Sequence, residues 1–370
     1  MIEIVEDNKD GRGRFEEIVE KYKPIKKDLC EEFYKDLFEI RQPQFYKKFD
    51  RAKYYQFITG LKLKKEDEKF WIYYPWLNSI YLVPNENIYL EVITARNRPL
   101  VNWLDQQKFY NFNLGVVGLS VGQSAALTIV RSGGCKNIKI ADFDIIGPSN
   151  LNRIHFGLPQ VGQSKSKVLA QRLLEINPFA NVSVFDKGLN QDNLQDFFQK
   201  DFKLDAVIDA CDYFPTKIMI REFARKMKIP VLMATDVGDG SLLDIERYDL
   251  DDQIEVFGGR LKNIKPDDSF MQKALKIISP DQIPVSLIEV LSEVGKSTPT
   301  HPQLATSVYF SGVMMSYAVR RIATNQAISD KRHNIQLEEF LDPRHQDKKF
   351  ISYKKAKVAE LKALLGMEKE

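Results

Sequence analysis

Short apolar runs alternate with segments of helical spacing through the middle of the chain. The stretch 114–144 shows the pattern: an apolar run is followed by a glycine-containing turn, an alanine-rich segment and a second apolar run that ends in acids. Short β-branched runs are typical of buried strands, and the segment between them has the composition of a connecting helix. This stretch therefore predicts a strand, a helix and a second, parallel strand.

The same alternation continues well beyond residue 144. It predicts strands at 114–118, 137–142, 181–186, 205–209 and 230–234, with helices near 122–132, 164–175, 191–200 and 216–227. Strands and helices in regular alternation indicate a parallel sheet with helices on both faces. We expect a doubly wound, Rossmann-like α/β fold with a mostly parallel sheet.

Residues 1–93 differ in pattern and predict a small N-terminal α+β accessory domain. Apolar residues near helical spacing in 14–40 predict one or two amphipathic helices. The aromatic and β-branched segment 69–93 predicts two strands, joined by a turn at 84–87. The cluster of aromatic residues in 71–76 is expected to form core rather than a ligand platform.

The pattern weakens after Asp236. Residues 237–300 are turn-rich and acidic, with one helical stretch near 269–278, and 301–323 predict a long helix. A final amphipathic helix is expected at 354–365. We expect the α/β domain to span 94–340, and 341–370 to form a C-terminal helical tail.

Composition narrows the class of protein. A net charge of +3 is too small to indicate a nucleic-acid partner, and no apolar run approaches the length that spans a membrane. The three cysteines are far apart and form no C-x-x-C pair, which indicates a reducing compartment and no structural zinc. The charged N-terminus has no signal-peptide pattern. We expect a soluble, cytoplasmic protein with no membrane partner.

Candidate ligand-binding residues follow the predicted strands. Ligands of such sheets lie beyond the carboxyl ends of the strands. Gly118, Ser120 and Gly122 form a turn that presents a helix N-terminus to a phosphate, and Asp142 and Asp144 follow the next strand. The turn departs from G-x-G-x-x-G, because a serine replaces one glycine and the last interval is short. By itself it fits a nucleotide site or an ordinary tight turn.

Additional charged residues favour ATP chemistry. Arg153 and Lys165 follow the acids, and Asp212 follows the predicted strand 205–209. A dehydrogenase needs only the glycine turn and a ribose acid. Attack of a carboxylate on the α-phosphate of ATP also requires cations and a metal, because negative charge builds on the phosphoryl oxygens. Arginine and lysine bind phosphate, and a carboxylate can hold Mg²⁺.

The residues 94–236 resemble the ThiF/HesA/MoeB adenylating enzymes, which are related to ubiquitin-activating enzymes. The resemblance rests on the motifs GLSVG, DFD, SNLNR, VGQSK, NP and DACD, in the family's order and near its spacing. The segments WIYYPW, RNR and LDIER, together with PQL at 302–304, are similar to a bacterial ThiF-domain subgroup. Some members of that subgroup are fused to a nitroreductase-like domain, which this chain lacks.

The resemblance implies a role for each matching residue. Asp144 would hold the ribose hydroxyls, Arg153 and Lys165 would neutralise the phosphates, and Asp212 would coordinate Mg²⁺. Arg98 matches an arginine that relatives bring to the phosphates, often from the partner subunit of a dimer, which implies a homodimer. The remaining implied nucleotide contacts are Gly118, Ser120, Gly122, Asp142 and Asn150, the last also supporting its loop.

The implied activity is that of an ATP-dependent adenylyltransferase with ATP and Mg²⁺. It would convert a substrate carboxylate, on a small protein, a peptide or a small acid, into an acyl adenylate and release pyrophosphate. The zinc-binding cysteine pairs of many relatives are absent, and no cysteine stands where a thioester would form. Two alternatives stay open: a nucleotide-binding scaffold of the same fold, and an NAD(P)-dependent dehydrogenase.

Other polar residues near these motifs are assigned mainly structural roles. We expect Asp209 to be structural rather than ligating, and Cys211 to be a small buried residue beside the site. His155 and His301 are interpreted as structural or capping, because no nucleophile accompanies them. For Lys217 the sequence does not separate a phosphate contact from a solvated helix residue.

Overall fold

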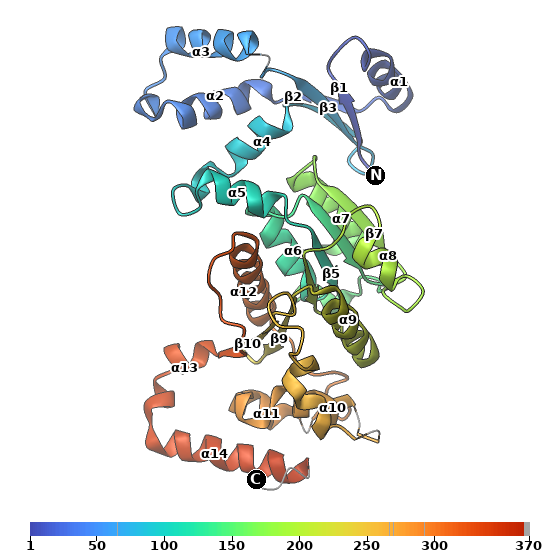
Figure 1. Cartoon of the computed structure of the whole chain (residues 1–370), viewed down its shortest axis with the longest axis vertical. Helices are drawn as coiled ribbons and strands as arrows, with labels where there is room; N and C mark the ends of the chain where they lie inside the picture. Colours follow the sequence, from blue (N-terminus) through green and yellow to red (C-terminus); the bar gives the residue numbers. More distant parts are fainter. Residues whose placement is uncertain (65, 266, 269, 292, 366–370) are drawn as a thin grey trace. The chain divides into compact units, whose positions relative to one another are not determined.

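The computed structural model describes the chain except residues 65, 266, 269, 292 and 366–370 (Figure 1). It divides into two compact units, each described here by itself. Unit 1 comprises Met1–Tyr110 and Leu174–Ala180, and unit 2 comprises Asn111–Leu173 and Asn181–Glu370. Among the described residues, no helix has both the length and the apolar character needed to cross a membrane.

Unit 1 is a small four-stranded sheet with helices. The strands are β1 (Glu3–Glu6), β2 (Ile25–Asp28), β3 (Lys69–Tyr74) and β4 (Ser79–Pro84), in the order β1-β3-β4-β2, with β2 parallel to β4. The helices are α1 (Arg12–Tyr22), α2 (Cys30–Arg41), α3 (Arg51–Leu63), α4 (Glu86–Ile93) and α5 (Trp103–Tyr110). Trp71 and Tyr73 are buried among apolar side chains of this unit, so the prediction that the aromatic cluster forms core is confirmed.

Two details of the prediction for unit 1 were wrong. The hairpin turn lies at 75–78, where Asn78 adopts a left-handed backbone, and not at 84–87. Residues 86–93 form helix α4, because the Asn85 side chain accepts a hydrogen bond from the Ile88 amide and caps the helix. The strand β2, between α1 and α2, was also missed; its four residues are all exposed and carry no alternation of apolar and polar positions.

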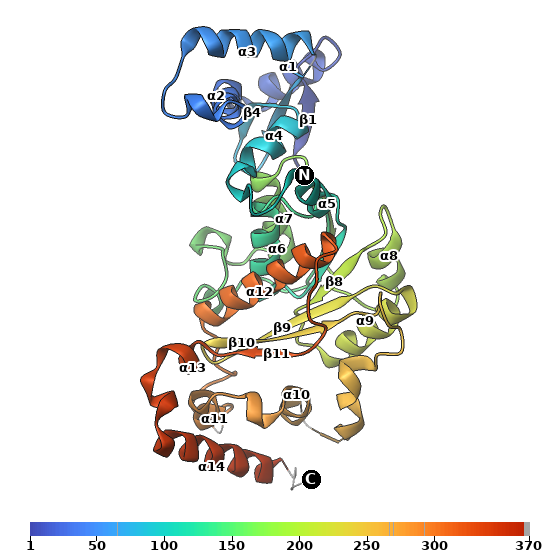
Figure 2. The ribbon, with the colours of Figure 1, turned by 60° about the vertical axis from the view of Figure 1, so that its left-hand side comes forward.

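Unit 2 is built on a seven-stranded sheet in the order β11-β10-β9-β8-β5-β6-β7. The strands are β5 (Leu114–Val117), β6 (Asn137–Ala141), β7 (Asn181–Phe185), β8 (Ala206–Asp209), β9 (Val231–Val237), β10 (Gly240–Glu246) and β11 (His333–Ile335). The strands from β7 to β9 are parallel, whereas β10 and β11 are antiparallel to their neighbours, at the edge seen in Figure 2. The predicted mostly parallel α/β sheet is confirmed.

The helices that follow pack on this sheet or on other elements, and the residues of α7 from Leu174 onward belong to unit 1. They are α6 (Gly122–Arg131), α7 (Lys165–Ile176), α8 (Leu194–Gln199), α9 (Phe214–Met227), α10 (Phe270–Ile278), α11 (Val285–Leu291), α12 (Ala305–Ala323), α13 (Leu337–Leu341) and α14 (Lys348–Leu364). Val117 of β5 packs in one core with residues of α8 and α9, while Val116 points to the opposite face and approaches the start of α6. Adjacent strand residues face opposite sides, so the two valines mark the two helical layers.

Short 3₁₀ turns complete the chain. They are η1 (Pro43–Phe45), η2 (Ala95–Asn97), η3 (Pro148–Asn150), η4 (Leu158–Gln160), η5 (Val256–Asn263), η6 (Pro280–Gln282) and η7 (Pro343–Gln346). The predicted boundaries at 93/94 and 340/341 remain predictions.

The strand order reverses its direction at β5. From β5 the chain first adds β6 and β7 on one side, and then adds β8 and β9 on the other. In open α/β sheets the loops that leave adjacent strands in opposite directions open a crevice at this point. The carboxyl ends of β5, β6 and β8 are therefore the place to look for a ligand site.

Candidate nucleotide-binding site

A cavity of about 850 Å³ lies at the carboxyl ends of β5, β6 and β8. Its walls come from the turn after β5, the loop after β6, the loop after β8 and the segment 187–191 after β7. Most of the predicted site residues line it together: Gly118, Ser120, Asp142, Asp144, Asn150, Arg153, Lys165 and Asp212. Residues up to 94 positions apart in sequence thus meet at one edge of the sheet.

The turn after β5 requires glycine at Gly118. Its φ is +83°, and a Cβ there would lie 2.3 Å from the carbonyl oxygen of Ala210. A side chain is excluded both by the backbone conformation and by this approach of the β8 loop. Gly122 is the first residue of α6, and a Cβ on it would lie 2.8 Å from Val116 Cγ1. Gly122 therefore allows close packing of helix on strand; a contact from it to nucleotide remains a prediction.

Ser120 presents an unused hydroxyl beside the start of α6. The oxygen is buried, and among the described residues it has no hydrogen-bond partner. The first amides of a helix also lack intrahelical partners and lie at the positive end of the helix dipole. The turn therefore offers several hydrogen-bond donors to one side of the cavity.

The two acids after β6 have different environments. Asp142 is buried, and its carboxylate accepts hydrogen bonds from the amides of Leu119 at 2.6 Å and Asp144 at 2.7 Å. Burial raises the pKa of Asp142, although these two amides and Lys165 oppose the shift. Asp142 therefore holds the glycine turn against the end of β6, and a contact from it to nucleotide remains a prediction.

Asp144 faces the cavity and pairs with a lysine. Its side chain is 51% exposed, and one carboxylate oxygen lies 2.8 Å from Nζ of Lys165, whose own side chain is only 6% exposed. Lys165 begins α7, and its amide donates a hydrogen bond to the Asp144 carbonyl. An ammonium group and a carboxylate are thus fixed next to each other at the wall of the cavity.

Arg153 is held by the loop that follows β6. Its Nη1 donates to the Ser149 carbonyl at 3.0 Å and to Oδ1 of Asn152 at 2.9 Å. Its Nε is buried and, within the part of the chain that the structure describes, has no partner. Asn150 shapes the same loop, because its side-chain oxygen accepts from the Gly147 amide. A buried guanidinium donor without an acceptor suits a ligand oxygen.

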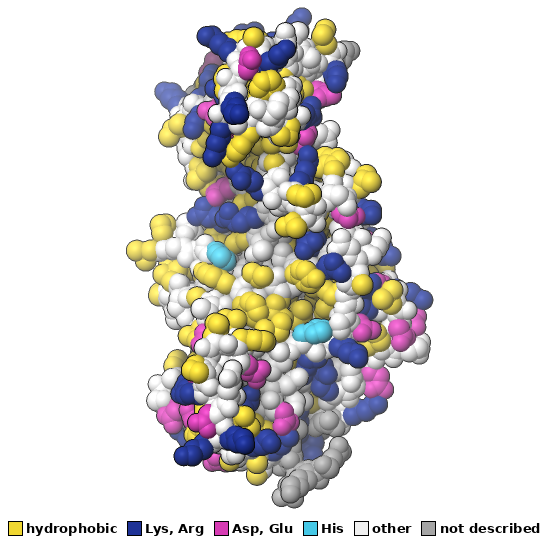
Figure 3. All heavy atoms as spheres, turned by 90° about the vertical axis from the view of Figure 1, so that its left-hand side faces the viewer, with side chains coloured by type: hydrophobic (Ala, Val, Ile, Leu, Met, Phe, Trp, Pro, Cys, Tyr) yellow, Lys and Arg dark blue, Asp and Glu magenta, His cyan; other side chains and the backbone are white. Residues whose placement is uncertain are grey.

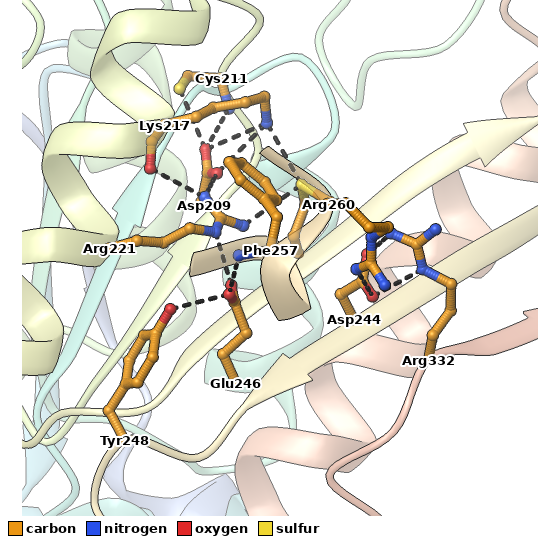
Figure 4. A network of polar contacts seen from close by, with 11 residues as sticks. Asp209, Cys211, Lys217, Arg221, Asp244, Glu246, Tyr248, Phe257, Arg260 and Arg332 are labelled. Atoms are coloured by element: carbon orange, nitrogen blue, oxygen red, sulfur yellow. Dashed lines mark hydrogen bonds and ion pairs between the residues drawn. The ribbon is translucent and has the colours of Figure 1, made fainter. Parts of the chain in front are cut away.

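Behind the cavity, Asp209 belongs to a buried ionic network (Figure 4). Its carboxylate contacts Arg221, Lys217 and the thiol of Cys211, and Arg221 also binds Glu246. Burial alone would raise the pKa of Asp209, but the cations Lys217 and Arg221 outweigh it and lower the pKa to about 2. The geometry agrees with a structural role for Asp209 and gives Lys217 an ion-pair partner.

Asp212 lies three residues further along and lines the cavity. It is exposed, and no described residue forms a hydrogen bond or ion pair with its carboxylate. Asp236 lies near it: burial raises the pKa of Asp236, Gln303 and His301 lower it, and the charge of Asp212 raises it further. Mg²⁺ prefers oxygen ligands, often one or two carboxylates with water and phosphate oxygens. An unpaired carboxylate in the same cavity as Arg153 and Lys165 fits that requirement.

Arg98 is the one predicted catalytic residue outside unit 2. In unit 1 its guanidinium lies 3.8 Å from Glu91 and 4.8 Å from the centre of the Trp103 ring. It also lines a separate, charged pocket of unit 1 together with Arg41 and Glu66. Its role at the phosphates remains a prediction.

Several cavity residues were missed by the sequence reasoning. Phe143, between the two acids, is 70% exposed, and Tyr213 after Asp212 is 65% exposed. Gly188 adopts φ +72°, and a Cβ on it would lie 2.8 Å from the Phe143 ring. An exposed aromatic residue within a strand-end motif is a detectable signal, because such a residue offers a surface to a planar base.

Of the remaining candidates, His155 and Cys211 contact the protein around them, whereas His301 lines a cavity. His155 stacks on Tyr309 with ring centroids 4.2 Å apart, and burial lowers its pKa. Burial raises the pKa of the Cys211 thiol far above its usual range, so it is a poor nucleophile. His301 precedes α12, whose N-cap is Leu304, and lines another cavity described below.

The ThiF family matches residues 94–336. An uncharacterized protein MT1398 of Mycobacterium tuberculosis is 31% identical over 284 residues, which cover 75% of this chain but only 39% of that protein. The tRNA threonylcarbamoyladenosine dehydratase of Bacillus subtilis is 29% identical over 210 residues, covering 54% of this chain and 80% of that protein.

A solved structure of the E. coli tRNA N6-threonylcarbamoyladenosine dehydratase in complex with ATP has a TM-score of 0.47 and 20% identity. It covers 65% of this chain and 96% of that chain.

The expected resemblance is confirmed at the level of the family, while the subgroup with the GLSVG turn remains a prediction. The chain belongs to the ThiF family.

Proposed function

We propose that this protein is an ATP-dependent adenylyltransferase, which activates a substrate carboxylate as an acyl adenylate and releases pyrophosphate. One observation carries the proposal: an arginine, a lysine and an unpaired carboxylate meet in one cavity at the sheet's switch point. Membership of the ThiF family supports it. A nucleotide-binding scaffold would not require this set of charges.

The phosphates are proposed to bind hydrogen-bond donors that have no partner among the described residues. Arg153 Nε and the Ser120 hydroxyl are buried donors without partners among the described residues. A triphosphate would supply acceptors for both, and the start of α6 adds backbone amides of positive partial charge. Lys165 contributes a second cation, fixed through its ion pair with Asp144.

The ribose and base are assigned to the β6 side of the cavity. Asp144 has a half-exposed carboxylate, which can accept hydrogen bonds from ribose hydroxyls while it keeps Lys165. Phe143 offers an exposed ring next to it. Asp142 acts indirectly, because its carboxylate is occupied by the amides that shape the turn.

Asp212 is proposed to hold Mg²⁺ together with phosphate oxygens. When bound, the ion would neutralise charge on the phosphates and on departing pyrophosphate. The carboxylate is otherwise without a partner among the described residues, which agrees with such a ligand.

The reaction is a displacement at the α-phosphorus. A substrate carboxylate oxygen forms a bond to it, the bond to the oxygen bridging the α- and β-phosphates breaks, and pyrophosphate leaves with that electron pair. No net proton transfer is required. Arg153 and Lys165 stabilise the negative charge that develops on the phosphoryl oxygens.

We further propose a carboxylate-bearing partner, such as a small protein, a peptide or a small acid. One relative, 30% identical over 140 residues, is named sulfur carrier protein ThiS adenylyltransferase of E. coli. A homodimer is also proposed. Tyr309, Val313 and Tyr317 are exposed at four-residue spacing on α12, and Figure 3 shows hydrophobic side chains gathered on this face. An apolar stripe of this kind is typical of an interface.

The test is stabilisation of the full chain by MgATP. A ligand at about one hundred times its dissociation constant adds about 2.7 kcal/mol to the free energy of unfolding. We expect this effect in the wild type, dependence on Mg²⁺, and at least a tenfold weaker affinity in Arg153→Ala. Arg131→Ala is the matched control, because Arg131 is an exposed arginine of α6 away from the cavity lining.

Two results would contradict the proposal. Stabilisation by NADH but not ATP would favour the dehydrogenase alternative, which leaves Arg153 and Asp212 without a role. MgATP binding that survives Arg153→Ala unchanged would remove the site assignment itself.

A further inference from the structure

A second cavity of about 380 Å³ adjoins the nucleotide cavity. The two share the loop after β8, since Ala210, Cys211 and Asp212 line both. Each lies within unit 2. A ligand in the second cavity would therefore reach the carboxylate that faces the phosphates.

The walls of this second cavity are almost entirely apolar. Met233 comes from β9, Leu275 and Ile278 from α10, Ile283 from the segment before α11, and Leu287 from α11 itself. Its volume is within the range of small-molecule sites, which is roughly 300–1,000 Å³. An occupant with polar groups along its length would lose hydration without gaining partners from these walls.

Polar side chains make up the rest of the lining, and they include Cys211 and Thr235 as well as the residues that follow. Asp212 follows β8, Asp236 lies near the end of β9, and Thr300 and His301 come from the segment before α12. Lys217 also lines the cavity, with Nζ 3.3 Å from Asp209. The occupant thus needs one polar end, near Asp212, and one apolar body.

We infer that this cavity is the subsite for the acyl part of the substrate, and that the substrate is a carboxylic acid with an aliphatic or aromatic tail. The inference rests on the proposed adenylation. It adds that the carboxylate lies at the end shared with the nucleotide cavity, and that the tail extends between β9, α10 and α11.

The charges near the shared end are compatible with a carboxylate there. Lys217, which pairs with Asp209, and His301 line the cavity, and burial raises the pKa of Asp236. The proposed Mg²⁺ on Asp212 would offset the charge of that residue. The same chemistry occurs in a free acid and in the C-terminal residue of a peptide, so the experiment includes both.

The experiment is ATP–pyrophosphate exchange by the full chain with MgATP and a series of acids. Straight-chain acids from acetate to decanoate and 3-phenylpropanoate form one arm, and peptides ending in Leu, Phe or Gly-Gly form the other. Burial of each methylene is expected to lower KM about fourfold until the cavity is full. Exchange with free acids alone identifies a free acid as the substrate. Exchange with peptides that end in Leu or Phe identifies the C-terminal residue of a peptide as the substrate.

Two cavity variants and one control locate the effect. Ala274→Phe fills the cavity from α10 and should raise KM for octanoate at least tenfold, while stabilisation by MgATP shows that the variant folds. Leu287→Ala enlarges the cavity and should move the optimum to longer acids. Ala356→Phe, at an exposed position of α14, is the matched control and should behave as the wild type.

The outcomes separate this inference from the proposed function. A KM that does not change along the series, or exchange with Gly-Gly peptides alone, would overturn the apolar subsite and leave adenylation intact. If MgATP does not stabilise the protein, adenylation fails. Thermal stabilisation by octanoate without nucleotide, lost in Ala274→Phe, would then still support the cavity as a site for apolar acids, and its absence would overturn it.

Discussion

Two aspartates lie at the carboxyl end of β6 and two at that of β8, and at both strand ends the inner and outer acids have different environments. Asp142 and Asp209, the inner acids, are buried and bound by the protein itself. Asp144 and Asp212, the outer acids, are exposed and line the nucleotide cavity, whereas Asp142 also lines it but is buried. Position relative to the strand end, and not residue type, decides whether the carboxylate supports the fold or faces a ligand.

The two inner acids also differ from each other. Asp142 receives neutral backbone amides, and burial raises its pKa. Asp209 receives Lys217 and Arg221, which lower its pKa to about 2 against the effect of burial. Two amides do not offset the effect of burial on the pKa of Asp142, whereas two cations more than offset it at the fully buried Asp209.

The largest effect is expected for Asp209→Asn. The change leaves Arg221, whose side chain is fully buried, with one carboxylate partner, Glu246, where it had two. Removing one member of a buried ionic group typically costs about 3–5 kcal/mol. We expect a loss of about 3 kcal/mol in the free energy of unfolding at pH 7, measured by urea denaturation. A loss below about 1 kcal/mol would show that the network does not stabilise the fold.

The same variant has an expected pH dependence. The lowered pKa means that the folded protein keeps Asp209 ionised where the unfolded chain takes up a proton. The stabilisation is therefore present above about pH 4 and is lost as the pH falls toward 2. The stability difference between wild type and Asp209→Asn should be constant from pH 8 to 5 and shrink below pH 4. A difference that grows on acidification would contradict the assignment.

A smaller loss is expected for Asp142→Asn. An amide at this position can accept only one of the two backbone hydrogen bonds, from Leu119 and Asp144, and turns a donor toward the other. Hydrogen bonds to a charged group contribute about 1.5–3 kcal/mol, so we expect a loss of about 2 kcal/mol. Because the glycine turn depends on this contact, affinity for MgATP should fall as well, which calorimetry would detect. Unchanged affinity would separate Asp142 from the geometry of the turn.

The sequence was sufficient to predict the elements between 114 and 234 and the grouping of eight site residues. The alternation of apolar runs and helical segments is strong there, and parallel strands place their carboxyl ends at one edge. The strand ends predicted that Gly118, Asp144 and Asp212 lie together, whereas Arg153, Lys165 and Asn150 were assigned to the same site from phosphate chemistry and the family resemblance. The sequence did not separate Asp142 from Asp144, because both belong to one short motif and only the fold directs one inward.

Strand β10 shows why some elements after residue 236 were not predicted from the sequence. Its seven residues are all buried, yet they include Asp244 and Glu246, which resemble solvent-exposed acids in the sequence. Their partners are Arg332 for Asp244 and Arg221 for Glu246, as Figure 4 shows. A strand with acidic residues looks exposed in the sequence. Here the strand is buried, because arginines that are distant in the sequence pair with its acids. The apolar cavity was missed for a similar reason, since β9, α10 and α11 form it only in three dimensions.

The smallest effects on stability are expected for the outer acids, and they would sharpen the comparison most. Asp212→Asn removes no described contact, so the free energy of unfolding should change by less than about 0.5 kcal/mol. Asp144→Asn leaves the largely buried Lys165 without its ion pair and should cost about 1 kcal/mol. Both variants should nevertheless lose most of their stabilisation by MgATP, measured as the shift in Tm. Asp212→Asn would then bind nucleotide poorly with an intact fold, whereas Asp209→Asn would be destabilised and retain its cavity residues. If Asp212→Asn instead destabilised the protein as strongly as Asp209→Asn, the division between inner and outer acids would not hold at β8.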